Sequence, residues 1–156
     1  MIRKDRQITD PDKIEEIIRS CRVMRLAMSG DNAPYVVPLN FGYQLDGSQL
    51  TLYFHCAAEG KKTDIIKKNP RVCFEMDVEF EIVGPGNEAC RYSCKYASVI
   101  GFGEAREVSD HEKEKGLLLI LKHAAGDRPY NLDPKAVDNT SVYKIVSSDF
   151  TGKTNK

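Results

Sequence analysis

The chain has 156 residues, enough for one domain with a single hydrophobic core. It carries 23 basic and 23 acidic side chains, so it lacks the strong basic excess that is typical of nucleic-acid-binding proteins. No apolar run is long enough to cross a bilayer, and residues 1–6 lack the apolar segment of a signal peptide. We therefore expect a cytoplasmic protein that binds neither nucleic acid nor a membrane.

The predicted elements begin with a helix that Asp10 caps and Pro11 opens, and its apolar face carries Ile14, Ile17 and Ile18. Two further helices are expected at residues 60–68 and 110–124, and a capping box of Ser109 and Glu112 opens the last one. Strands are expected at residues 23–29, 34–43, 49–55, 71–83, 96–108 and 141–147. The proline at position 38 predicts a bend or bulge in the second strand.

The order of these elements is helix, three strands, helix, two long strands, helix, strand. Helices and strands do not alternate regularly, so a doubly wound parallel sheet is excluded in favour of a small antiparallel barrel with helices outside it. Residues 1–150 are predicted to form a single domain, and residues 151–156 a loose polar tail.

The five cysteines do not indicate a metal site. An odd number of cysteines without an export signal predicts reduced thiols. Cys90 and Cys94 form the tightest pair, but no second pair of cysteines or histidines follows at a useful spacing. We predict no metal ligands.

The segment from Tyr53 to Lys62 is the best candidate for a binding site. A strand ends at His55, small residues follow, and a helix starts after Gly60 with Lys61 and Lys62. The free N–H groups at a helix N-terminus favour a phosphate, whereas two lysines there oppose the helix dipole unless an anion binds. The same lysines could equally be solvated side chains without a ligand.

Two neighbouring features offer groups for a flat heterocycle. His55 is a candidate hydrogen-bonding group or proton donor, although most single histidines are structural. Val37, Pro38 and Asn40 lie in a strand where a proline exposes backbone groups, and its alternative interpretation is a bent edge strand. A dinucleotide fingerprint is excluded, because the Gly-Phe-Gly at residues 101–103 is followed by a strand. No nucleophile triad is recognisable.

Several segments together resemble nitroimidazole-resistance proteins, a branch of the pyridoxamine-phosphate-oxidase-like superfamily. The resemblance rests on residues 3–10, 35–43, 53–62, 69–75, 96–105 and 150–153, in that order. It implies a mainly β fold with flanking helices, a six-stranded antiparallel split β-barrel, and a homodimer with a flavin at the subunit interface. The flavin is expected to be FMN, with FAD as the alternative.

The resemblance also implies roles for individual residues. Those expected at the cofactor are Val37, Pro38, Asn40, His55, Ala57, Ala58, Gly60, Lys61, Lys62 and Ser98. The lysines with Gly60 would hold the phosphate, Ala57 and Ala58 would line the ribityl and ring region, and Ser98 would assist from a long strand. Cys56 departs from the serine expected there, and a thiol is a weaker hydrogen-bond donor.

The implied activity is flavin-dependent reduction of a small nitroaromatic substrate with electrons from NAD(P)H, with His55 as the catalytic residue. Three alternatives stay open: a pyridoxamine-phosphate-oxidase-like oxidase, a non-catalytic flavin or haem protein in which His55 binds the iron, and a partner-binding module without a chromophore.

Overall fold

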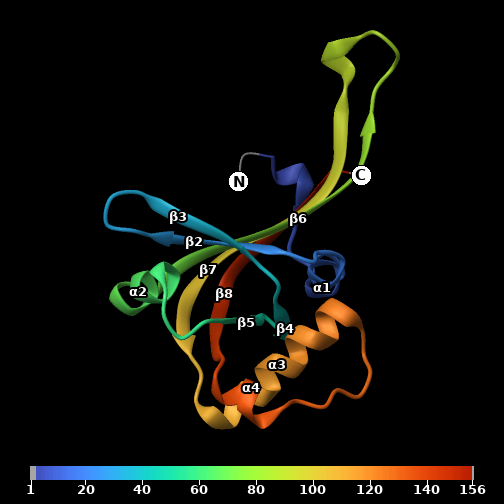
Figure 1. Ribbon diagram of the computed structural model, residues 1–156. Coiled ribbons are helices and arrows are strands. Elements are labelled where there is room, and N and C mark those ends of the chain that lie inside the picture. Colours follow the sequence, from blue (N-terminus) through green and yellow to red (C-terminus); the bar gives the residue numbers. More distant parts are fainter. Residues whose placement is uncertain (1–2, 156) are drawn as a thin grey trace.

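The structure is a computed structural model that describes residues 3–155, and one curled antiparallel sheet dominates it (Figure 1). The strands are β1 (Gln7–Ile8), β2 (Met24–Ser29), β3 (Pro34–Leu39), β4 (Gly42–Asp46), β5 (Gln49–Cys56), β6 (Arg71–Val83), β7 (Ser93–Glu107) and β8 (Ser141–Asn155). They follow the order β3-β2-β6-β7-β8-β5-β4, and β1 pairs with β8. The mainly β, barrel-like fold is confirmed, but the described residues form eight strands rather than six, and the sheet does not close.

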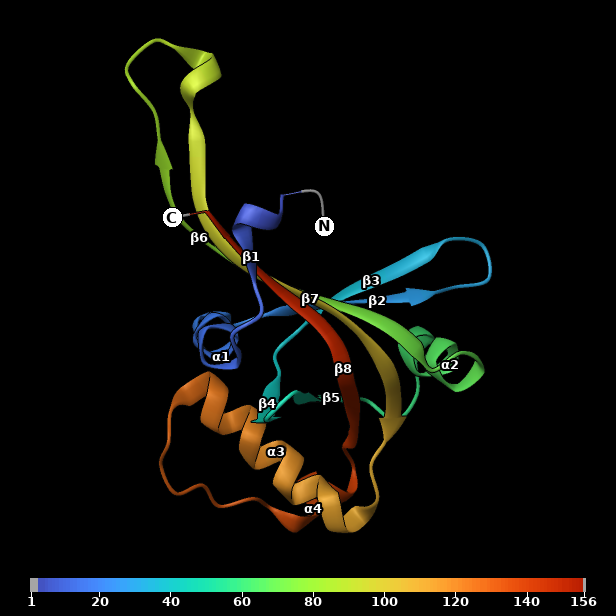
Figure 2. The ribbon, with the colours of Figure 1, turned by 180° about the vertical axis from the view of Figure 1, so that it is seen from behind.

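Four α-helices flank the sheet, and the two views in Figures 1 and 2 show α2 at a different side of it from α1 and α3. The helices are α1 (Pro11–Ser20), α2 (Lys61–Lys68), α3 (Asp110–Ala125) and α4 (Pro134–Asp138), with short 3-10 turns at Lys4–Arg6 and Ala89–Arg91. Asp10 caps α1 as predicted, because its Oδ1 accepts from the Asp12 N–H at 3.1 Å. None of the described helices combines the length and apolar character that a membrane crossing needs.

The capping box predicted for α3 is wrong. Ser109 occupies the cap position, but its side chain makes no capping hydrogen bond. The Glu112 carboxylate instead accepts from the Tyr53 hydroxyl at 2.8 Å and from Lys144 Nζ at 2.6 Å. Tyr53 and Lys144 on the sheet below α3 therefore bind the Glu112 carboxylate that the local sequence predicted to cap the helix.

Residues 34–43 form two strands rather than the single predicted strand. β3 and β4 lie at opposite ends of the strand order, because the chain leaves the sheet edge at Asn40 and buries Phe41 completely. Pro38 causes no bulge, since the β2–β3 register runs without a break. β3 is an edge strand, the position in a sheet where a proline is tolerated.

The C-terminal residues also differ from the prediction. Residues 151–155 continue β8, with Asn155 opposite Tyr96 of β7 and Lys153 opposite Gln7 of β1. The Asn155 amide donates to the Cys94 carbonyl at 2.7 Å. The expected loose tail is therefore wrong for these residues, and Lys156 lies outside the described ones.

The core lies inside the curl of the sheet, where alternate strand residues converge. Phe74 and Leu26 stand opposite each other there, and α1 adds Ile14 and Ile18. A smaller apolar cluster fixes α3 to the other face of β5 and β8, with Tyr53 and Val142 beneath it. The curl and the two helical attachments leave the ends of β3 and β5 near the start of α2.

Candidate functional site

The first turn of α2 presents backbone donors without a side-chain cap. Gly60 precedes it with φ 150° and ψ 166°, a combination that is essentially restricted to glycine. A Cβ at this position would meet no atom within 4 Å, so the backbone conformation, and not lack of space, requires the glycine. Thr63 Oγ1 donates back to the Gly60 carbonyl at 2.6 Å and supports the turn. The arrangement leaves N–H groups available to an anion.

Both lysines of this turn lie over aromatic rings. Lys61 Nζ is 4.4 Å from the centroid of the Tyr35 ring of β3, and Lys62 Nζ is 5.3 Å from that of Phe54 of β5. Among residues 3–155 neither ammonium forms an ion pair with a carboxylate. Asp64 lies in the same first turn but contacts neither ammonium, so an anion there would offset the unpaired lysine charges and their conflict with the helix dipole.

Tyr35 and Phe54 were missed by the sequence analysis. Phe54 stacks on Tyr143 with ring centroids 5.4 Å apart and is fully buried, whereas Tyr35 is half-buried. A signal for Tyr35 was present, because it shares a strand face with Val37 two residues later. The position of either ring below a lysine depends on long-range packing and has no local signal.

Cys56 lies beside this cationic turn at the end of β5. Burial raises the pKa of its thiol, the Lys62 charge partly opposes that rise, and Glu107 adds to it. Ser141, which stands opposite Cys56, donates its hydroxyl to Glu107 Oε1 at 2.7 Å. Cys56 is accordingly a neutral thiol and contributes only a weak donor to the site.

His55 is exposed and points to the face of β5 opposite to Phe54, because successive strand residues alternate. It stands opposite Val142 and shares its face with Tyr53. Ala57 and Ala58 follow as exposed residues of the loop that leads to α2. His55 and the two lysines are therefore close in sequence but lie on different sides of β5: Lys62 lies over Phe54, and His55 points to the opposite face.

The predicted residues of β3 are also divided between the two sides. Val37 packs inward against the core, whereas Pro38 is exposed on the outer face opposite Arg25. Asn40 follows the strand, and its amide donates to the Arg22 carbonyl at 3.0 Å. One hydrogen of the Asn40 amide is thus already used inside the chain.

Ser98 lies on the same outer face of the sheet as Pro38, because Arg25 stands opposite Pro38 and pairs with Asp77, which stands opposite Ser98. It stands on the outer face of β7 between Asp77 of β6 and Lys153 of β8. Along β8, Lys153 is eleven positions from Val142, which faces His55, and this corresponds to a strand path on the order of 35 Å. Within one chain, Ser98 and His55 therefore lie at different parts of the sheet.

The outer face around Ser98 carries exposed apolar side chains. Ile100 and Phe102 of β7 are 45% and 46% exposed, and Val146 of β8 is 41% exposed. These side chains lie on one side of the sheet, since Ile100 faces Thr151 and Glu104 faces Val146 across the β7–β8 ladder. We call Ile100, Phe102 and Val146 the outer apolar patch. Exposed apolar side chains gathered in this way are typical of an interaction surface.

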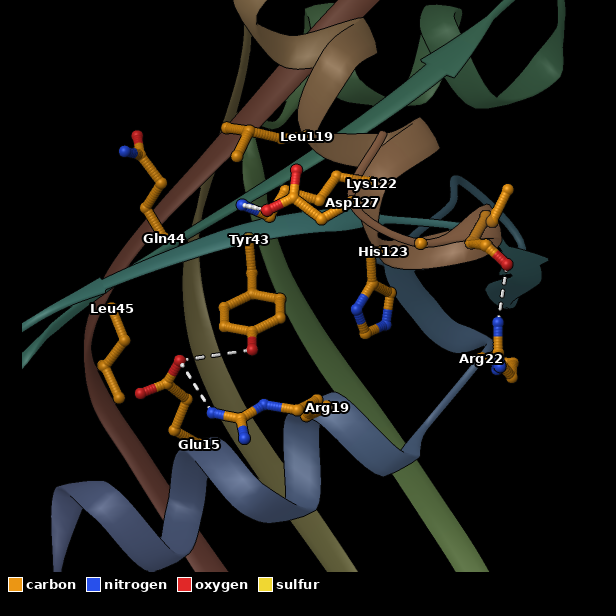
Figure 3. A pocket seen from close by; sticks show the side chains of 13 residues that line it. Glu15, Arg19, Arg22, Tyr43, Gln44, Leu45, Leu119, Lys122, His123 and Asp127 are labelled. Carbon is orange, nitrogen blue, oxygen red and sulfur yellow. Dashed lines mark hydrogen bonds and ion pairs between the residues drawn. The ribbon is translucent and has the colours of Figure 1, made fainter. Parts of the chain in front are cut away.

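Two further observations bear on cofactor chemistry. All five cysteines are free, and within residues 3–155 no three His, Cys, Asp or Glu side chains gather closely enough to hold a metal ion. A cavity of about 680 Å³ lies between α1, α3 and β4 (Figure 3). None of the residues predicted to hold the cofactor lines this cavity, so the cavity and the start of α2 are separate places in the molecule.

Comparison with known proteins identifies the family. Residues 10–154 match the family described as pyridoxamine 5'-phosphate oxidase. The chain belongs to this family. A candidate 5-nitroimidazole antibiotic resistance protein from Bacteroides thetaiotaomicron is 31% identical to this chain, with a TM-score of 0.81 over 95% of this chain and 86% of that chain. The predicted resemblance to the nitroimidazole-resistance branch is therefore confirmed.

Structures of lower sequence identity share the fold. An FAD and haem binding protein from Mycobacterium smegmatis has a TM-score of 0.79 at 15% identity, over 97% of this chain and 74% of that chain. An FAD-binding protein from Mesorhizobium loti has a TM-score of 0.65 at 23% identity, over 97% and 98% of the two chains. A comparison with curated protein sequences gives no match.

Proposed function

We propose that the protein is a flavin-dependent oxidoreductase that reduces nitroaromatic compounds of the 5-nitroimidazole type. The observation that carries this proposal is the cationic, uncapped start of α2, where Lys61 and Lys62 have no acidic partner in the described chain. Membership of the family and the 31% identical relative support it. A bound flavin would supply electron transfer from NAD(P)H to the nitro compound.

The residues at α2 fit a flavin phosphate. Gly60 leaves open space beside the backbone, the first-turn N–H groups are uncapped, and two ammonium groups lie at the same end. These hydrogen-bond donors suit one terminal phosphate, which favours FMN. FAD is the alternative, because it also carries phosphate groups that such donors can bind. Lys62 would provide the principal charge, and Lys61 the second.

The remaining predicted residues would bind and orient the rings. Val37 would offer an apolar contact, Pro38 and Asn40 their carbonyl groups, and Ala57 and Ala58 a narrow turn that lets the cofactor approach the backbone. His55 would orient the substrate and hold a proton for it. In these roles the chain excludes water and fixes geometry.

We also propose a homodimer with the flavin at the subunit interface. The outer apolar patch supports it, because Ile100, Phe102 and Val146 are exposed on one face of the sheet. Ser98 lies on this face, and a second copy seated there would allow Ser98 of one subunit to assist the site of the other. This arrangement accounts for the two directions in which the predicted residues point.

A non-catalytic flavin or haem protein on the same barrel is the second candidate. The Mycobacterium smegmatis neighbour, an FAD and haem binding protein, favours it, since its fold matches 97% of this chain. His55 is exposed and would be available to a haem iron. An oxidase of the pyridoxamine-phosphate type would use the same flavin site.

The first experiment is an absorption spectrum of the purified protein, followed by release and chromatography of the cofactor. Flavin bands and released FMN or FAD support the proposal, a Soret band favours haem, and a colourless protein that cannot be loaded with flavin refutes both. A flavoprotein is then assayed for reduction of a 5-nitroimidazole with NADH and NADPH. A protein that binds flavin but shows no such turnover would support only the flavin-binding function.

Two pairs of variants test the named residues. Lys62→Gln is expected to weaken FMN binding by roughly tenfold, since it removes one ammonium from the phosphate site. The matched control is Lys67→Gln, at the other end of the same helix, which should bind FMN normally. His55→Ala should lower nitroreductase turnover at saturating flavin while His111→Ala, an exposed histidine of α3, does not. Unchanged turnover in His55→Ala would remove His55 from the mechanism.

A further inference from the structure

The cavity between α1, α3 and β4 has the size of a small-molecule site. Its volume of about 680 Å³ falls within the range that holds drug-sized ligands. Figure 3 shows Tyr43 of β4 between Glu15 and Arg19 of α1 on one side and His123 of α3 on the other. Residues from three separate elements thus converge on one space, away from the start of α2.

The charges around this cavity do not balance. Its charged lining consists of three cations and two carboxylates: Arg19, Arg22, Lys122, Glu15 and Asp127. Both carboxylates are already paired, Glu15 with Arg19 at 3.5 Å and Asp127 with Lys122 at 2.7 Å. Arg22 donates to the Ala124 carbonyl at 2.6 Å and has no carboxylate partner within residues 3–155. The lining is therefore cationic by one charge when His123 is neutral.

His123 is held as a neutral ring beside this charge. Its Nε2 lies 2.7 Å from the Cys21 carbonyl oxygen, which can only accept, so Nε2 carries the hydrogen and Nδ1 is an acceptor. Burial lowers the pKa of His123, the hydrogen bond to the Cys21 carbonyl partly opposes this, and the nearby Arg22 lowers the pKa further. The imidazole packs against Phe41 at 4.5 Å and meets the Tyr43 ring edge-on at 5.3 Å. It therefore acts as an aromatic wall and not as a second cation.

The rest of the lining suits a flat apolar body. Leu45 of β4 and Leu119 of α3 are half-buried and face the cavity together with the Tyr43 ring. The Tyr43 hydroxyl is occupied by Glu15 at 3.3 Å, so the ring presents its apolar surface. A ligand that fits has one negative charge near Arg22 and an aromatic body that packs against Tyr43, His123 and the leucines.

We propose that this cavity is a second ligand site, which binds a small aromatic carboxylate. The carboxylate pairs with the guanidinium of Arg22, and the ring packs on Tyr43 and His123. The site shares no lining residue with the flavin site at α2, so the inference stands independently of the proposed redox function. One hydrogen bond links the two regions, because the Arg22 carbonyl accepts from the Asn40 amide.

Isothermal titration calorimetry with 2-naphthoate and its neutral isostere 2-naphthamide tests the need for a negative charge. The wild-type protein should bind one naphthoate per chain and bind naphthamide at least tenfold more weakly. Arg22→Gln should weaken naphthoate binding about tenfold, and Leu45→Trp, which fills the cavity, should abolish it. The control is Arg25→Gln, on the outer face of β2, which should bind as the wild type does. Equal binding of the two ligands, no saturable binding, or equal loss in Arg22→Gln and Arg25→Gln overturns the proposal.

The position of the ligand is tested by NMR of the imidazole groups. The chain has three histidines, and only His123 lines the cavity. Naphthoate should shift the His123 resonances and leave those of His55 and His111 unchanged, at the concentrations that saturate the calorimetric signal. A shift at His55 instead would place the acid near the flavin site, and unchanged His123 resonances would equally contradict the cavity site. This measurement uses the wild-type protein, so it does not depend on how well the variants fold.

Discussion

Replacing Gly60 with alanine separates backbone strain from steric contact at the proposed phosphate site. The added Cβ has open space around it, so packing alone predicts no loss. The backbone angles of φ 150° and ψ 166°, however, cost a residue with a side chain about 1–3 kcal/mol. The smaller entropy of the unfolded alanine chain offsets about 0.4–1 kcal/mol of this. We therefore expect a net loss of about 1–2 kcal/mol, which lowers Tm by about 2–8 °C for a chain of this length.

The assay is scanning calorimetry of the flavin-free protein, followed by titration of Gly60→Ala with FMN. Relief of the strain would turn the first-turn N–H groups of α2, so FMN affinity should fall as well. Gly47→Ala is the matched control, because Gly47 has a positive φ of 58° and open space, but lies in the β4–β5 turn. It should lose stability and keep its FMN affinity. Unchanged Tm and unchanged FMN affinity in Gly60→Ala would refute the reasoning.

Three other predictions address the fold, the dimer and the buried histidine. Gly42→Ala should lower the free energy of unfolding by about 3 kcal/mol, and so lower Tm more than Gly60→Ala does, because its Cβ would lie 2.4 Å from the backbone carbonyl carbon of Leu119 in α3. In sedimentation, Phe102→Glu should convert a dimer to monomers, since it buries a carboxylate in the outer apolar patch, whereas Leu118→Glu on the exposed side of α3 should not. Burial holds the pKa of His123 below its ordinary value of 6.5, so as pH decreases His123 is protonated in the unfolded chain before it is protonated in the folded one. The free energy of unfolding should therefore fall as pH decreases below about 6.5. Urea unfolding at pH 7.5 and 5.5 should show this loss in the wild type and not in His123→Gln.

Local signals predicted the elements whose ends are marked by special residues. Asp10 and Pro11 located the start of α1, and Gly60 located that of α2. β6 was predicted with its observed bounds, because alternating apolar residues precede a clear glycine and proline break. In these segments the local preference and the long-range packing favour the same structure.

The incorrect predictions lie where long-range contacts decide. Nothing local separates β3 from β4, since the division follows from the burial of Phe41 and the close approach of Gly42 to α3. Residues 151–155 are polar and look like a tail, yet pairing with β7 and β1 makes them a strand. The predicted use of Glu112 at a helix end failed because Tyr53 and Lys144 come from distant strands.

The candidate site shows the same division between local and long-range information. The sequence located the cationic start of α2, because Gly60 and two lysines carry the signal within three residues. It could not show that His55 and Pro38 point to the outer face while Val37 and Phe54 point inward, since the direction of a strand residue depends on register. Nor could it reveal the cavity at Arg22 and His123, whose lining comes from α1, β4 and α3.

The directions in which the predicted site residues point favour a site that is completed by a second subunit. A planar cofactor held by the lysines at α2 would lie beside the ends of β3 and β5, whereas Pro38 and Ser98 face the outer side of the sheet, so the predicted residues of one chain would not surround it. The exposed outer apolar patch adjoins Ser98, because Ile100 is the next outward-facing residue of β7. A second copy on this patch would therefore bury apolar surface and supply a second wall to the site in the same step. For this reason subunit association and flavin retention should be lost together in Phe102→Glu, whereas Lys62→Gln should weaken flavin binding in a protein that is still dimeric.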